Sequence, residues 1–212
     1  MTTPFTVAQF LDVFVAYNAA IWPAQLGAYA IGLVAVAALW LAQRKAARII
    51  PAILAVMWLW NAVGYQYLFF SRINPAATVF AALFAAEAVL LAMSAISSRA
   101  LFSPPSRSLK SAIGAFFIAY AYLIYPALGY LAGHGFMAGP MFGVAPCPTV
   151  IFTIGLLLMA RGRWVIWLSV IPILWSLIGL AAALQLGILE DFGLPIAGLA
   201  LLLAIKTRPS IA

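Results

Sequence analysis

Charged residues are scarce in this sequence. Only 7% of its 212 residues are charged, whereas 67% are hydrophobic, and the mean hydropathy is +1.14. A soluble globular domain carries about 25% charged residues, so this composition excludes a soluble domain. Apolar runs that fill most of the chain predict an integral membrane protein with short loops. Such loops leave no room for an appended nucleotidase, protease or DNA-binding domain.

Cysteine and histidine are almost absent, since Cys147 and His134 are the single examples of each. These counts exclude a disulfide within the chain and a Cys/His zinc cluster. The sequence also lacks paired carboxylates at glycosidase spacing, the HExxH and GxSxG motifs, a Gly-rich phosphate loop and the multiple histidines of di-metal membrane enzymes. We therefore expect no catalytic residues, no cofactor and no enzymatic activity.

Seven apolar runs are candidates for crossing a bilayer, which takes about 20 residues in a helix. The fifth and seventh have only about 15 residues and could instead be tilted, re-entrant or joined to helical loop segments. Before the first run, Thr6 and Gln9 match a helix capping box, and Phe10 and Phe14 share a face away from Asp12. Residues 1–20 are therefore expected to form a short amphipathic helix in the membrane interface. We predict an all-α, polytopic membrane helix bundle that forms one transmembrane domain over residues 1–212. Its spans are expected near 21–42, 49–70, 75–97, 109–131, 146–160, 163–186 and 191–205.

The basic residues predict the orientation of these seven spans. Arg72 is alone in its loop, and the other ten basic residues fall in alternate loops and at the C-terminus. By the positive-inside rule, that side is the cytoplasm. The N-terminus is then outside and the C-terminus inside. The placement of the basic residues assigns the net charge of +7 to the membrane. The expected partner is therefore the lipid bilayer, and nucleic acid is not expected.

The predicted outer loop at residues 132–147 holds no charge and is rich in glycine and proline. It is too apolar for a mobile linker, so we expect it to fold back onto that end of the bundle. Glu190 and Asp191, in the last outer loop, have the pattern of a solvated turn.

Three polar residues are predicted at mid-membrane depth. Glu87 lies 12 residues past Pro75, which is about 18 Å along a helix, and Asn61 and Ser176 reach similar depths. A charge there costs about 2.5–3.5 kcal/mol or more. One interpretation is a site that handles protons or cations. The other is a neutral Glu87 that joins helices through a hydrogen bond to Asn61 or a tyrosine.

The outer half is predicted to be richer in polar side chains. We expect Asn18, Gln25 and Gln66 to line a vestibule there together with Cys147. Cys147 precedes a predicted helix, whose dipole favours a thiolate, so Cys147 and His134 are candidate ligands for a soft metal. The alternatives are a small buried cysteine and a histidine that makes loop hydrogen bonds.

Two segments of this outer half are distinctive, namely YNAAIWPAQ at residues 17–25 and FGVAPCPT at residues 142–149. They resemble a bacterial family of multi-span membrane proteins of unknown function. The resemblance implies a protein of the bacterial inner membrane, and it supplies no activity or catalytic residue.

Two functions fit these features. The first is a small transporter or channel for a small solute or an ion, including a soft metal, with a polar vestibule that leads toward Glu87. The second is a non-catalytic accessory subunit that packs into a larger membrane complex or a homo-oligomer. Small residues such as Gly27 and Gly32 favour the second, because they allow close helix approach.

Overall fold

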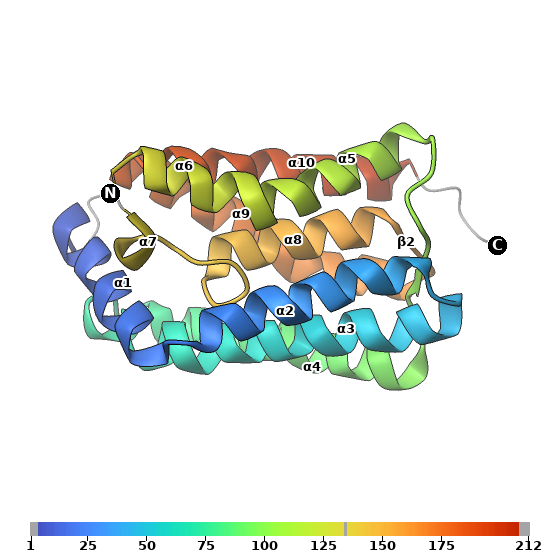
Figure 1. Cartoon of the computed structure of the whole chain (residues 1–212), viewed down its shortest axis with the longest axis horizontal. Coiled ribbons are helices and arrows are strands. Elements are labelled where there is room, and N and C mark those ends of the chain that lie inside the picture. Colours follow the sequence, from blue (N-terminus) through green and yellow to red (C-terminus); the bar gives the residue numbers. More distant parts are fainter. Residues whose placement is uncertain (1–3, 134, 208–212) are drawn as a thin grey trace.

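The computed structural model of the chain describes residues 4–133 and 135–207. It is all-α and 80% helical, which confirms the all-α part of the predicted fold class (Figure 1). The described residues also include two short antiparallel strands, β1 and β2, in which Leu101 pairs with Arg161 and Phe102 with Ala160. The elements in chain order are α1 Val7–Ile21, α2 Ala24–Ala37, η1 Ala38–Trp40, α3 Gln43–Trp60, η2 Asn61–Tyr67, η3 Phe70–Arg72, α4 Ala77–Ser97, β1 Leu101–Phe102, α5 Leu109–Ala119, η4 Tyr120–Ile124, α6 Tyr125–Leu131, α7 Gly135–Ala138, α8 Pro146–Leu158, β2 Ala160–Arg161, α9 Trp164–Leu186, η5 Leu189–Phe192 and α10 Gly193–Lys206.

Four helical segments in the described part of the chain are long and apolar enough to cross a membrane. They are Gln43–Arg72, Ala77–Ser97, Leu109–Leu131 and Trp164–Leu186. A fifth is counted if α1 and the helix that runs from Ala24 to Trp40 form one span, although the two are bent by 83°. Helices also occupy the predicted fifth and seventh spans, but they are only 13 and 14 residues long. The count of seven crossings therefore stays a prediction.

Helix α1 has the local structure that its sequence predicts. The Thr6 hydroxyl accepts from the backbone N–H of Gln9, and the Gln9 side chain accepts from the backbone of Thr6, so the capping box is present. The bend after Ile21 turns α1 away from the direction of α2, and α1 lies across one end of the bundle (Figure 1). Its Phe14 and Tyr17 side chains are buried against that end.

Helix α8 is the central element of the fold. Its residues are buried from Pro148 to Leu158, and it packs on α3, α5, α9 and α10. At 1.5 Å per residue, 13 residues span about 20 Å, short of the roughly 30 Å of a hydrocarbon core. The preceding loop is buried from Phe142 to Ala145, which confirms that it folds onto the bundle. Irregular backbone at such depth is tolerated where protein surrounds it.

Glycines allow α5 and α8 to come into backbone contact. A Cβ atom on Gly155 would lie 2.8 Å from the carbonyl oxygen of Gly114, and one on Gly114 would lie 2.7 Å from that of Gly155. The two glycines expected to admit a partner helix differ. Gly32 packs against the Phe142 ring of the same chain, whereas a Cβ atom on Gly27 would meet nothing within 4 Å.

Candidate functional site

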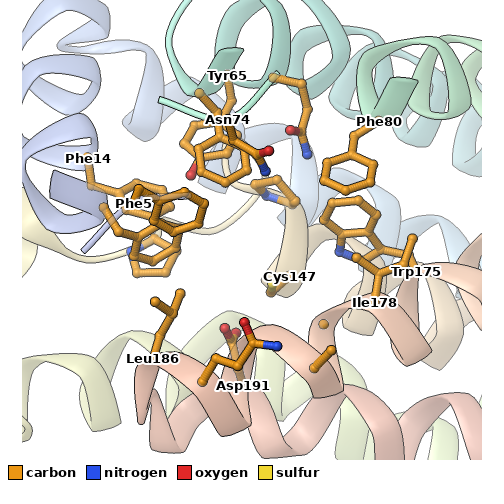
Figure 2. A pocket seen from close by; sticks show the side chains of 18 of the residues that line it. Phe5, Phe14, Tyr65, Asn74, Phe80, Cys147, Trp175, Ile178, Leu186 and Asp191 are labelled. Carbon is orange, nitrogen blue, oxygen red and sulfur yellow. The ribbon is translucent and has the colours of Figure 1, made fainter. Parts of the chain in front are cut away.

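A cavity of about 230 Å³ is lined in part by Phe10 and Phe14 of α1. Its walls are mostly aromatic and aliphatic. Figure 2 shows Phe5, Phe14 and Tyr65 gathered on one side and Phe80, Trp175 and Ile178 on the other. The lining residues are Pro4, Phe5, Phe10, Phe14, Tyr65, Gln66, Phe70, Asn74, Phe80, Pro140, Pro146, Cys147, Trp175, Ile178, Gly179, Ala181, Gln185, Leu186 and Asp191.

Asp191 forms a polar end to this cavity, close to Cys147 (Figure 2). The Tyr125 hydroxyl donates a hydrogen bond to its Oδ1 atom, and the Cys147 thiol also donates to its carboxyl group. The pKa of Asp191 is raised to about 6, mainly by burial and to a smaller extent by the charge of Glu190, while the hydrogen bonds from Tyr125 and Cys147 lower it. Asp191 is therefore largely ionised at neutral pH.

The expectation that Glu190 and Asp191 form a solvated turn was wrong. Glu190 is fully buried and Asp191 is 3% exposed. The cause is the position of η5, which packs against α6, α9 and α10. Adjacent acids in a short loop resemble a surface turn in sequence, and only the long-range packing of η5 onto α6 distinguishes the two cases.

Gln66 places a polar group without a partner on the cavity. Gln66 is 0% exposed, and neither atom of its amide has a hydrogen-bond partner. The indole N–H of Trp175 interacts with the Cys147 thiol instead. Gln66 belongs to η2, a π-helical stretch, and such stretches occur frequently at functional sites. The Trp175 ring is held edge-on by Phe80 and Phe84, with its nitrogen directed toward Cys147 (Figure 2).

Two of the predicted vestibule residues have structural roles instead. The Asn18 amide donates to the carbonyl oxygens of Met137 and Gly139 at 2.8 and 3.0 Å. The Gln25 amide donates to the carbonyl oxygen of Asn18 at 2.9 Å. These bonds join α1, α2 and the loop before α8, and neither side chain lines the cavity. Of the predicted set, Gln66 and Cys147 are the two that the cavity brings together.

The three predicted mid-membrane residues also lie outside the cavity lining. The Asn61 amide donates to Met57, to Gly143 and to the hydroxyl of Thr149, at 2.8–3.3 Å. The Ser176 hydroxyl donates to the carbonyl oxygen of Pro172 at 2.8 Å. Glu87 is fully buried, and neither of its carboxyl oxygens has a partner, so the expected bond from Glu87 to Asn61 or a tyrosine is not formed.

The structure gives little support to the predicted metal ligands. His134 lies outside the described residues. Among those described, no three His, Cys, Asp or Glu residues are grouped to hold a metal ion. The predicted thiolate at Cys147 was wrong, because the thiol keeps its proton and donates it in a hydrogen bond to the Asp191 carboxyl.

Tyr65, Tyr125 and Trp175 were not expected from the sequence to be parts of this site. For Trp175 a signal was available. Tryptophan in membrane proteins concentrates at the two interfaces, whereas Trp175 lies in the middle of α9. A tryptophan at that depth indicates a local polar or aromatic environment. Tyr65 sits near a span end and resembles an interface residue, although it is buried in an aromatic cluster.

Tyr17 fastens α1 over this end of the bundle. Its hydroxyl donates to the carbonyl oxygen of Val144 at 2.7 Å and accepts from the Trp60 indole at 2.8 Å. Replacing Tyr17 with phenylalanine leaves both groups without a partner, which costs about 1–3 kcal/mol. We expect a lower melting temperature in detergent and faster alkylation of Cys147 as α1 loosens.

The matched control for Tyr17→Phe is Tyr67→Phe, because the Tyr67 ring is exposed. This control is expected to change stability by less than about 0.5 kcal/mol. Equal melting temperatures for the two variants would show that the Tyr17 hydroxyl does not hold α1 in place.

Comparison with known proteins gives a family and no activity. No curated protein matches the chain, and no solved structure matches it. The model of a family of unknown function, DUF6064, matches residues 7–210. The chain therefore belongs to the DUF6064 family, as the resemblance to a family of unknown function predicted.

Proposed function

We propose that this protein is a transporter or channel for a small solute, which binds in the cavity beneath α1. The proposal places it in the bacterial inner membrane with seven crossings, the N-terminus outside and the cavity facing outward. The observation that supports it most strongly is the buried amide of Gln66, which lines the cavity without a hydrogen-bond partner.

The energetics of Gln66 favour a binding site over a structural role. An unsatisfied buried polar group costs about 1–3 kcal/mol. Asn18, Gln25 and Asn61 reduce that cost, because each amide nitrogen donates to a backbone carbonyl oxygen, although each amide oxygen lacks a partner. Gln66 differs from them because its amide borders open volume. A solute with hydrogen-bonding groups would satisfy it, and that difference supports ligand binding.

The alternative function, an accessory subunit, has less support. Its argument depended on small residues that let a partner helix approach closely. Gly32, one of those residues, is covered by Phe142 and Tyr122 of the same chain. Co-purification of a stoichiometric partner in mild detergent would favour the accessory role.

Cys147 provides a direct test of the cavity. It is the single cysteine of the chain and it lines the cavity, so a thiol reagent reports on this position without a background. We expect a membrane-impermeant methanethiosulfonate reagent to modify Cys147 when it is added on the periplasmic side of intact cells. Mass spectrometry of the purified protein measures the modified fraction.

Cys147→Ser is the control, because it must abolish modification. The same reagent trapped inside inverted vesicles, where it meets only the periplasmic face, should also react. Modification from the cytoplasmic face alone would overturn the proposed orientation. No modification from either face, in protein that reacts fully when it is denatured, would overturn the cavity as a compartment that solutes enter.

A further inference from the structure

The walls of the cavity are suited to a cation. Phe5, Phe10, Phe14, Tyr65, Phe70, Phe80 and Trp175 all line it. Aromatic faces carry partial negative charge, and cages of such rings are used to recognise quaternary ammonium groups. A neutral apolar molecule also fits among aromatic rings, so the walls do not by themselves select a charge.

The Asp191 carboxyl makes the cavity favour a positively charged solute. No lysine or arginine is among the described residues that line the cavity, so the Asp191 carboxyl has no cationic partner there. The titratable groups that face the Asp191 carboxyl belong to several elements. They are Tyr120 of η4, Tyr125 of α6, Cys147 of α8, the neighbouring Glu190, and Tyr65 of η2. All of them are neutral or negative. Hydrogen bonds from Tyr125 and Cys147 offset part of the cost of burying this carboxylate, and a cation beside it would offset more.

We propose that the solute is a small organic cation that carries an apolar group, with its charge near Asp191 and its apolar part among the aromatic rings. This assignment rests on the proposed function. The size of the cavity limits the solute, because a cavity of about 150 Å³ holds benzene. A volume of about 230 Å³ thus has room for one ring and a small ammonium group.

Benzyltrimethylammonium is a suitable probe, because its charge does not titrate. Its neutral counterpart is neopentylbenzene, in which carbon replaces the quaternary nitrogen and the shape is retained. Occupancy is measured as protection of Cys147 from methyl methanethiosulfonate, a neutral reagent, in purified protein. We expect the cation to give half-protection at a concentration at least about tenfold lower than the neutral compound.

The pH dependence of protection tests the role of Asp191 in the wild-type protein. Binding of a permanent cation requires the ionised carboxylate, and the pKa of Asp191 is about 6. The affinity should therefore fall as the pH drops through the pKa, be nearly constant from about one unit above it, and be about tenfold weaker at pH 5 than at pH 8. Protection by neopentylbenzene should not change over this range, because neither form of Asp191 attracts it by charge.

Asp191→Asn removes the charge and keeps the shape, and the Tyr125 hydroxyl can still donate to the amide oxygen. We expect this variant to lose at least about tenfold in affinity for benzyltrimethylammonium and to keep its affinity for neopentylbenzene. Asp12→Asn is the matched control, because Asp12 is exposed on α1 and outside the cavity. It should leave both affinities unchanged.

The outcomes separate the two proposals. Equal protection by the two compounds, or an unchanged preference for the cation in Asp191→Asn, would overturn the assignment of an organic cation and leave the cavity as a solute site. Failure of both compounds to protect, with Cys147 unreactive in the folded protein, would overturn the proposed function itself.

Discussion

Replacing Gly155 with alanine is expected to destabilise the protein strongly, although it adds one methyl group. The new Cβ atom would lie 2.8 Å from the carbonyl oxygen of Gly114 and 2.9 Å from the backbone nitrogen of Ile118. Both contacts are with backbone, so no rotamer change relieves them and α5 must move away from α8. Overpacking of this kind costs about 1–3 kcal/mol or more. Because α8 packs on four other helices, the displacement should spread through the bundle.

Gly27→Ala is the matched control for Gly155→Ala. It makes the same change inside α2, where a Cβ atom meets nothing within 4 Å. Alanine is favoured over glycine in a helix by about 0.5–1 kcal/mol, so this variant should be as stable as the wild type or slightly more so. Thermal unfolding in detergent, followed by size-exclusion chromatography, measures both. A Gly155→Ala protein with the same melting temperature as the wild type would show that α5 and α8 are not in backbone contact.

The helices themselves were largely predictable from the sequence. The span predicted at 109–131 is Leu109–Leu131, and the one predicted at 163–186 is Trp164–Leu186. Apolar runs are bounded by polar and basic residues, and these local signals lie next to the ends they determine. The Thr6 capping box is equally local. These signals do not determine the number of membrane crossings, because the lengths of α8 and α10 do not show whether these helices cross the membrane.

The candidate site was less predictable, because its chemistry depends on contacts far apart in the chain. Asn18 and Gln25 were expected to line a vestibule, and the sequence showed only that they are polar residues in an apolar region. Their partners are carbonyl groups, at Met137 and Gly139 for Asn18. Tyr125 and Asp191 are 66 residues apart, and their hydrogen bond appears only when η5 is packed against α6. The sequence shows which residues are polar, whereas their hydrogen-bond partners depend on the packing of distant segments.

Replacing Glu87 with methionine is expected to stabilise the protein. Glu87 is fully buried in α4, and both of its oxygens lack a partner. Asn61, the partner that its depth suggested, donates to Gly143 and Thr149 instead. Methionine has a similar length and no polar group to leave unsatisfied, and its flexible chain adapts to the space of the carboxyl. The expected gain is about 1–3 kcal/mol, the usual cost of an unsatisfied buried group.

Glu87→Gln distinguishes the carboxyl group from polarity in general. An amide at this position also lacks partners, so the glutamine variant should melt close to the wild type while the methionine variant melts higher. Both are measured by tryptophan fluorescence during heating in the same detergent. A methionine variant that melts below the wild type, with glutamine unchanged, would show that the polar side chain of residue 87 forms a stabilising hydrogen bond. The two variants thus test the sequence-based interpretation of Glu87 as a residue that joins helices, because only that interpretation requires a loss of stability.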